Sequence, residues 1–217
     1  MPYSGHVRVG GAPDVHELSH LIITKVAVGP MDNNAYLLRS RQTGDELLID
    51  AASDTGTLLA LLGEGPLRTV VTTHRHGDHW QALDAVVRAS GATTVAHEAD
   101  AGAIPVPTVR VVRDGDLVAV GECELEVIHL VGHTPGSIAL LYDDPTGSPH
   151  LFTGDSLFPG GVGRTTSPED FSHLFGDVRD KVFDRLPDET WVYPGHGDDT
   201  TLGAERPHLP EWRARGW

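Results

Sequence analysis

Four apolar segments of the chain each run into a glycine-containing turn that carries histidine or aspartate. The segments have the short, apolar and partly β-branched character of buried strands, and they span residues 68–72, 125–130, 151–153 and 190–193. Turns at strand ends are where a rigid scaffold presents reactive side chains. One such turn is unremarkable alone, but the repetition indicates that the four turns contribute to a common site.

The first turn is the densest in ligand-type residues. Residues 73–80 read Thr-His-Arg-His-Gly-Asp-His-Trp, so three histidines and one aspartate fall within six positions: His74, His76, Asp78 and His79. Imidazole and carboxylate are the groups that zinc and non-haem iron prefer. Gly77 lets the backbone turn sharply, so that these side chains can converge. This turn therefore predicts a metal site.

The other three turns carry one candidate ligand each, and these are His133, Asp155 and His196. With the first turn they supply five histidines and two aspartates, enough for two metal ions. The remaining eight of the 13 histidines follow no such pattern and receive no predicted role.

Composition excludes several classes of protein. The 31 acidic residues outnumber the 16 lysines and arginines, and the net charge of −15 argues against binding to nucleic acid or to an anionic membrane. The single cysteine, Cys123, excludes a disulfide framework and is predicted to be a small buried strand residue. Residues 1–6 lack the features of a secretory signal, and no apolar stretch is long enough to span a bilayer, so we expect a cytoplasmic protein.

The alternation of strands and helices predicts one α/β domain over residues 1–217. The first twenty residues are expected to form a loose lead-in. Helices are expected after Asp54, over 80–90 and over 168–186, the last of these being the final long helix. Trp212 and Trp217 are expected to pack on the body or on a second subunit, which leaves a homodimer open. Besides the four segments above, strands are expected at 21–28, 35–38, 46–49, 93–96, 109–112, 117–120 and 138–142.

The order of the ligand-type residues resembles the metallo-β-lactamase-fold hydrolase superfamily. The resemblance implies a four-layer αββα sandwich with the metal site at one edge. It implies a first metal held by His74, His76 and His133, and a second held by Asp78, His79 and His196. Asp155 would bridge the two ions. Asp50, which ends an apolar segment at 47–49, would lie behind the site and orient the first loop or a ligand histidine.

Within the superfamily, the chain is most similar to the short bacterial form of glyoxalase II, the hydroxyacylglutathione hydrolases. The similarity rests on residues 152–158 and 163–165 and on the Gly-His-Gly turn at 195–197. Many β-lactamases of this fold have Cys or Ser where Asp155 stands, and lactonases have Tyr where Phe158 stands. Long forms of glyoxalase II have Tyr where Asp198 stands, so the thiol half of the substrate can be glutathione or another small thiol. Arg164 is expected to bind a substrate carboxylate or to form a structural ion pair.

The resemblance implies a metal-dependent hydrolase with a small-molecule substrate and two divalent ions, zinc first, with iron or manganese as alternatives. The ions would lower the pKa of a shared water toward ~7, and Asp78 would orient the proton of the nucleophile. The enzyme alternatives are a persulfide dioxygenase, with one iron on His74, His133 and Asp155, and a lactonase. The non-enzyme alternative is a metal-stabilised binding protein. Because Asp78 and Asp155 would repel each other without metal, the metal-free protein is expected to be less stable.

Overall fold

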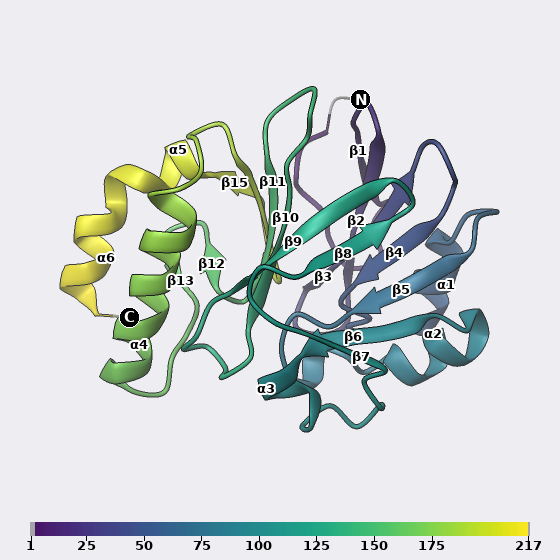
Figure 1. The fold of residues 1–217 in the computed structure, drawn as a ribbon, viewed down its shortest axis with the longest axis horizontal. Coiled ribbons are helices and arrows are strands. Elements are labelled where there is room, and N and C mark those ends of the chain that lie inside the picture. The colour runs from purple at the N-terminus through teal and green to yellow at the C-terminus, as the bar shows by residue number, and fades with distance from the viewer. Residues whose placement is uncertain (1–2, 217) are drawn as a thin grey trace.

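Two β-sheets packed face to face, with helices on both outer faces, make up the computed structural model, which describes residues 3–216 (Figure 1). Alternation along the strands explains this layering. In the strand Asn33–Ser40, Tyr36 and Leu38 join the core between the sheets, whereas Ala35 and Leu37 face the helices outside. The α/β fold class and the four-layer αββα sandwich predicted from the sequence are therefore confirmed.

The first sheet has seven strands in sequential order. The strands β1 to β4 are antiparallel, and β4 to β7 are parallel. Parallel neighbours need a crossover connection, and helices α1 (Thr55–Leu61), α2 (Leu83–Ser90) and α3 (Glu98–Ala101) lie in these connections. The seven strands are β1 (Asp14–Glu17), β2 (Leu21–Val28), β3 (Asn33–Ser40), β4 (Glu46–Ile49), β5 (Leu67–Val71), β6 (Thr93–His97) and β7 (Arg110–Val112).

The second sheet has six strands in the order β15-β14-β11-β10-β9-β8. They are β8 (Leu117–Val120), β9 (Cys123–His129), β10 (Ile138–Tyr142), β11 (His150–Gly154), β14 (Trp191–Pro194) and β15 (Thr200–Thr201). A small hairpin of β12 (Leu157–Phe158) and β13 (Gly161–Val162) follows β11. The outer face of this sheet is covered by α4 (Pro168–Asp177) and by α6 (Leu209–Arg215), which follows the short helix α5 (Leu202–Glu205).

The helical segments depart from the sequence prediction in two places. The segment predicted as one long helix is α-helical only to Asp177, continues as a π-helical turn over Val178–Phe183, and is not the last helix. Helix α2 begins at Leu83 rather than at residue 80, because Gly77–His79 form a separate 3₁₀ turn. Short 3₁₀ and π segments have no hydrophobic period of their own. The hydrophobic pattern of the sequence therefore did not distinguish them from the neighbouring α-helices.

Both chain ends hold more structure than the sequence indicated. Asp14–Glu17 form β1, an edge strand that pairs with β2, so the lead-in is loose only before it. Trp212 is buried against Phe183 in the core under α6, and so it packs on the body of the same chain. Trp217 lies outside the described residues. Within residues 3–216, no helix has the length and apolar character needed to cross a membrane.

A buried ion pair ties the N-terminal segment to the far end of the second sheet. Lys25 of β2 is completely buried, and its ammonium group donates to Asp199 Oδ1 at 2.6 Å and to the carbonyl oxygens of Gly5 and Gly197, each at 2.7 Å. Asp199 also accepts hydrogen bonds from the Tyr3 hydroxyl and the Trp191 indole, and burial raises the pKa of its carboxyl group. Every donor of the ammonium group thus has a partner, which a buried charge requires.

Removing the cation of this pair should destabilise the protein strongly. In Lys25→Met the Asp199 carboxylate stays buried without its charge partner, and we expect the free energy of unfolding to fall by about 3–5 kcal/mol. Lys181→Met is the matched control, because the Lys181 ion pair with Asp177 is partly exposed and worth at most about 1 kcal/mol. Urea denaturation measures both variants, and equal losses would contradict the expectation.

Two of the histidines without a predicted role share one hydroxyl group. His16 Nδ1 and His150 Nδ1 lie 2.8 and 2.9 Å from the hydroxyl oxygen of Tyr193, which is itself completely buried. Burial and, as a smaller contribution, the nearby imidazole of His16 lower the pKa of His150 to about 4. The native protein therefore holds His150 in its neutral form.

This environment predicts acid sensitivity. The folded pKa of His150 is below its unfolded value of about 6.5, so the unfolded chain binds the proton more readily. Stability should be complete above pH ~6.5 and fall by up to about 3 kcal/mol as the pH drops to ~4. In His150→Gln the free energy of unfolding should vary less with pH over this range, whereas the exposed control His208→Gln should follow the wild type. Denaturation at a series of pH values measures the slopes, and an unchanged slope in His150→Gln would refute this assignment.

Candidate metal centre

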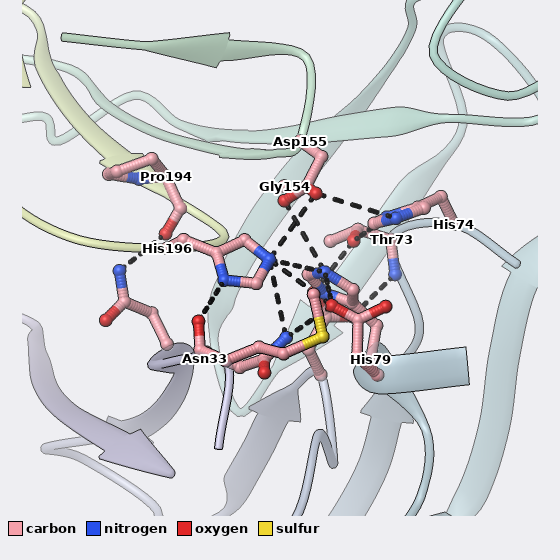
Figure 2. Close-up of polar contacts among 12 residues, drawn as sticks. Asn33, Thr73, His74, His79, Gly154, Asp155, Pro194 and His196 are labelled. Carbon is pink, nitrogen blue, oxygen red and sulfur yellow. Dashed lines mark hydrogen bonds and ion pairs between the residues drawn. The ribbon is translucent and has the colours of Figure 1, made fainter. Parts of the chain in front are cut away.

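The seven predicted ligands come together at the edge where strand ends of both sheets meet. Four of them, His74, His79, Asp155 and His196, are labelled in Figure 2. Strand β5 leads into the first loop, and β9, β11 and β14, which run in the same direction, lead to His133, Asp155 and His196. Three ligand groups form there, each with donor atoms within 4.8 Å of one another: His74, His76 and His133; His74, His79 and Asp155; and Asp78, His79 and His196.

Backbone hydrogen bonds hold the loops of this edge together. The amide of Ile138 donates to the Thr73 carbonyl at 3.0 Å, and the amide of Gly195 donates to the Gly154 carbonyl at 2.8 Å. The approach is so close that a Cβ atom on Gly195 would lie 2.2 Å from Asp155 Oδ1 and 2.9 Å from the His79 ring. Gly195 therefore leaves space beside the ligands that any other residue would fill.

The second ligand set contains two imidazoles whose lone pairs face each other. His79 Nδ1 lies 2.8 Å from the carboxylate of Asp50, and His196 Nδ1 lies 2.9 Å from the carbonyl oxygen of Met31. Both partners accept only, so each Nδ1 must donate and each neutral ring presents an unprotonated Nε2. The two Nε2 atoms are 3.3 Å apart, an arrangement that requires a cation or a proton between them.

The first set repeats this arrangement. His133 Nδ1 donates to the Arg164 carbonyl at 2.7 Å. His74 Nδ1 lies 3.1 Å from Thr73 Oγ1, whose own proton goes to the carboxylate of Asp50 at 2.8 Å. The Nε2 atoms of His74 and His133 are again 3.3 Å apart. Such outer partners fix which nitrogen of a histidine can bind a metal.

The two aspartates complete the sets. Asp78 Oδ2 lies 3.4 Å from the Nε2 atoms of both His79 and His196, and Asp155 Oδ2 lies 3.6 Å from His133 Nε2 and 3.5 Å from His196 Nε2. Ligands at 2.0–2.2 Å from a tetrahedral ion are separated by about 3.3–3.6 Å, so these spacings fit metal coordination. Asp155 Oδ1 is buried and accepts no hydrogen bond from residues 3–216. The donor set therefore fits two divalent ions, with Asp155 between them.

Electrostatics of the site depend on what lies between the rings. Burial lowers the pKa of His74 well below its usual value, so this ring is neutral, as a ligand must be. Burial also opposes a charge on His79, but the carboxylates of Asp50 and Asp155 raise the pKa of His79 to about 10. In the metal-free protein a proton thus occupies His79, and a metal must displace it.

Asp50 lies behind the predicted ligands, beside His79 and Thr73. Its carboxylate accepts from His79 Nδ1 and from the amide and hydroxyl groups of Thr73, and its backbone has a φ of 57°, in the left-handed region. Asn33, which sequence reasoning missed, donates from Nδ2 to Asp78 Oδ2 at 2.8 Å. The carbonyls of Met31 and Arg164 were also missed, because a main-chain acceptor leaves no signal in residue type.

A cavity of about 410 Å³ opens beside the first ligand set and is lined by His76, His133, Arg164, Thr165 and Thr166. The Arg164 side chain is exposed and forms no salt bridge within residues 3–216, so the structure offers no ion pair to occupy it. Phe158 lies near the other set, 6.4 Å from the His196 ring between centroids. Cys123 is a buried strand residue in β9.

Residues 28–196 match the family model of the metallo-beta-lactamase superfamily, and the chain belongs to this superfamily of metal-dependent hydrolases. A hydroxyacylglutathione hydrolase of Polaromonas sp. (strain JS666) is 36% identical over 179 residues, which cover 81% of this chain and 66% of that protein. The chain thus spans just under two thirds of the length of this relative.

Two solved structures extend the comparison. The crystal structure of ETHE1 from Myxococcus xanthus is 31% identical with a TM-score of 0.76, covering 88% of this chain and 84% of that one. The crystal structure of TTHA1623 in a di-iron-bound form is 35% identical with a TM-score of 0.69, covering 84% of this chain and 96% of that one. Both similarities extend over most of the sandwich.

Removing metal should lower the melting temperature of the protein. Without cations, the site holds two carboxylates close together, and a metal that binds only the folded chain adds stability that grows with the logarithm of the metal concentration over the dissociation constant. At about 100 times the dissociation constant this is worth about 2.7 kcal/mol, or roughly 5–10 °C for a chain of this size. Differential scanning calorimetry with and without a chelator measures the shift. An unchanged melting temperature would count against a stabilising metal centre.

Proposed function

We propose that this chain is a binuclear metal-dependent hydrolase that cleaves thioesters of the hydroxyacylglutathione type. The observation that carries the proposal is the completeness of the second ligand set: Asp78, His79 and His196 converge, and each is held by its own hydrogen-bond partner. The similarity to the Polaromonas enzyme supports the choice of thioester substrate.

The chain's own residues fix the geometry of the reaction. His74, His76 and His133 would hold one divalent ion and Asp78, His79 and His196 a second, zinc first, and these ions would supply the Lewis acidity that lowers the pKa of a water bound there toward ~7. Asp78, held by Asn33, presents its carboxylate beside this position and orients the proton of the attacking group. Asp155 lies between the two ligand sets and keeps them at a fixed separation. No serine or cysteine nucleophile is required.

The cavity beside His76 and His133 is the proposed substrate site. Arg164 has an exposed guanidinium group at its rim, which suits a bidentate contact to a substrate carboxylate. This cation and the bound metal ions would offset the net charge of −15 locally, so an anionic acyl-thiol is a suitable substrate. Glutathione is the first thiol to test, and other small thiols come next.

A persulfide dioxygenase is the second candidate, supported by the similarity to ETHE1. His74, His133 and Asp155 would then form a triad for one iron, and their donor atoms lie 3.3–4.0 Å apart. This alternative leaves the second set without a role in binding, although Asn33, Asp50 and Met31 all orient it. The oriented second set favours the hydrolase.

Metal-defined assays separate these functions. We expect about two metals per chain by elemental analysis, together with thiol release from lactoylglutathione. Lactones, phosphoesters and a β-lactam belong in the same panel, and oxygen uptake with glutathione persulfide tests the alternative. One iron per chain with oxygen uptake would overturn the hydrolase proposal. A metal-loaded protein that turns over no member of the panel would favour a binding protein.

The His76→Ala variant tests, in the same assays, whether activity depends on the metal content of the protein. Loss of one imidazole from the first set should remove about one metal per chain and lower kcat/KM more than ~100-fold. His173→Ala removes an exposed histidine of α4 and is the matched control, which should keep both properties.

A further inference from the structure

A buried carboxylate outside the ligand sets connects the two loops that carry the first set. Asp100, in the short helix α3, is completely buried. Its Oδ2 accepts from the Arg75 amide at 2.9 Å and from the Thr134 hydroxyl at 2.5 Å, and its Oδ1 accepts from the Gly136 amide at 2.9 Å. The Arg75 guanidinium lies 3.9 Å from Oδ1 and is the nearest cation.

These donors are next to the proposed ligands in sequence. Arg75 lies between His74 and His76, and Thr134 directly follows His133. One carboxylate therefore binds backbone or side-chain groups beside all three histidines of the first set, although Asp100 belongs to none of the ligand groups. The two loops leave different sheets, through β5 and β9, and besides Asp100 the hydrogen bond from the Ile138 amide to the Thr73 carbonyl connects them.

The packing leaves this position little freedom. A Cβ atom on Gly136 would lie 2.7–2.8 Å from the backbone and side chain of Asp100, so the loop runs directly against α3. A buried carboxylate is stable only when donors satisfy it, and here three donors do so. An amide in its place would have to turn its NH₂ group toward at least one N–H or O–H donor.

The second set is oriented by other groups. Asp50 holds His79, the Met31 carbonyl holds His196, and Asn33 holds Asp78. Each of these contacts is separate from the hydrogen bonds of Asp100. A change at Asp100 should therefore affect the two sets unequally.

We propose that Asp100 is a positioning residue for the first metal site: its carboxylate sets the separation between the His74–His76 loop and the His133 loop. The inference rests on the proposed two-ion assignment and concerns metal affinity. It is tested without substrate, so a wrong substrate assignment would leave it intact.

The test measures each site alone. Asp78→Ala disables the second set, so Co²⁺ titration of this variant, followed by visible absorption, reports binding to the first site. His76→Ala disables the first set, so the same titration of that variant reports binding to the second site. Asp100→Asn should weaken Co²⁺ binding about 10–100-fold in the Asp78→Ala background and leave it unchanged in the His76→Ala background. No loss in the first background, or equal loss in both, would overturn the proposal.

Two controls separate positioning from general stability. Asp144→Asn alters another buried aspartate, which caps its own turn through Thr146, and should leave Co²⁺ affinity unchanged at both sites. If Asp100→Asn does not fold, Thr134→Val still removes one donor and should lower first-site affinity several-fold. Thr134→Ser keeps the hydroxyl group and should restore it. Equal affinities in Thr134→Val and Thr134→Ser would contradict the proposed role.

Discussion

Two pairs of imidazole nitrogens face each other at 3.3 Å, and the surrounding structure is arranged to keep them there. Each Nδ1 is committed to an oxygen that can only accept in that arrangement, so a ring that turns away loses this hydrogen bond. For His74 and His79 the donor left unpaired would be buried. The facing lone pairs repel unless a proton or a cation lies between them. Metal affinity in this protein is thus prepared by the hydrogen bonds that fix the histidine rings.

Buried charges elsewhere in the chain support the same arrangement. Lys25, which is paired with Asp199, donates to the carbonyl of Gly197, and Gly197 directly follows the proposed ligand His196. Asp50 binds His79 and Thr73, and Asp100 binds both loops of the first set. A buried charge costs free energy of desolvation unless its partners are complete, and in each of these cases at least one partner belongs to a ligand-bearing loop or lies next to it. These buried charges therefore support the loops of the site as well as the packing of the interior.

Sequence alone could predict the candidate ligands, because they leave a signal in residue type, and the family resemblance that they carry implied the layers. A continuous apolar run such as 35–38 predicts a strand buried on both faces, and His or Asp after a strand end predicts a ligand. The orienting groups could not be found in this way. Met31 and Arg164 act through main-chain carbonyls, and Asn33 and Asp100 are ordinary polar residues until the fold places them. Strand β1 and helix α6 were missed because short or edge elements have too few residues to show a period.

The two ligand sets are oriented mainly by different hydrogen-bond partners, and this difference allows one fold to hold different numbers of metal ions. Asp155 is the only proposed ligand shared between the sets within residues 3–216, and the partners that fix His133 differ from those that fix His196. Losing an ion from one set removes attraction there but leaves the hydrogen bonds that orient the other set. The first three-histidine group can therefore stay formed when the second set is empty. Occupancy then depends on metal supply and on the protons of residues such as His79, whereas the fold itself remains the same.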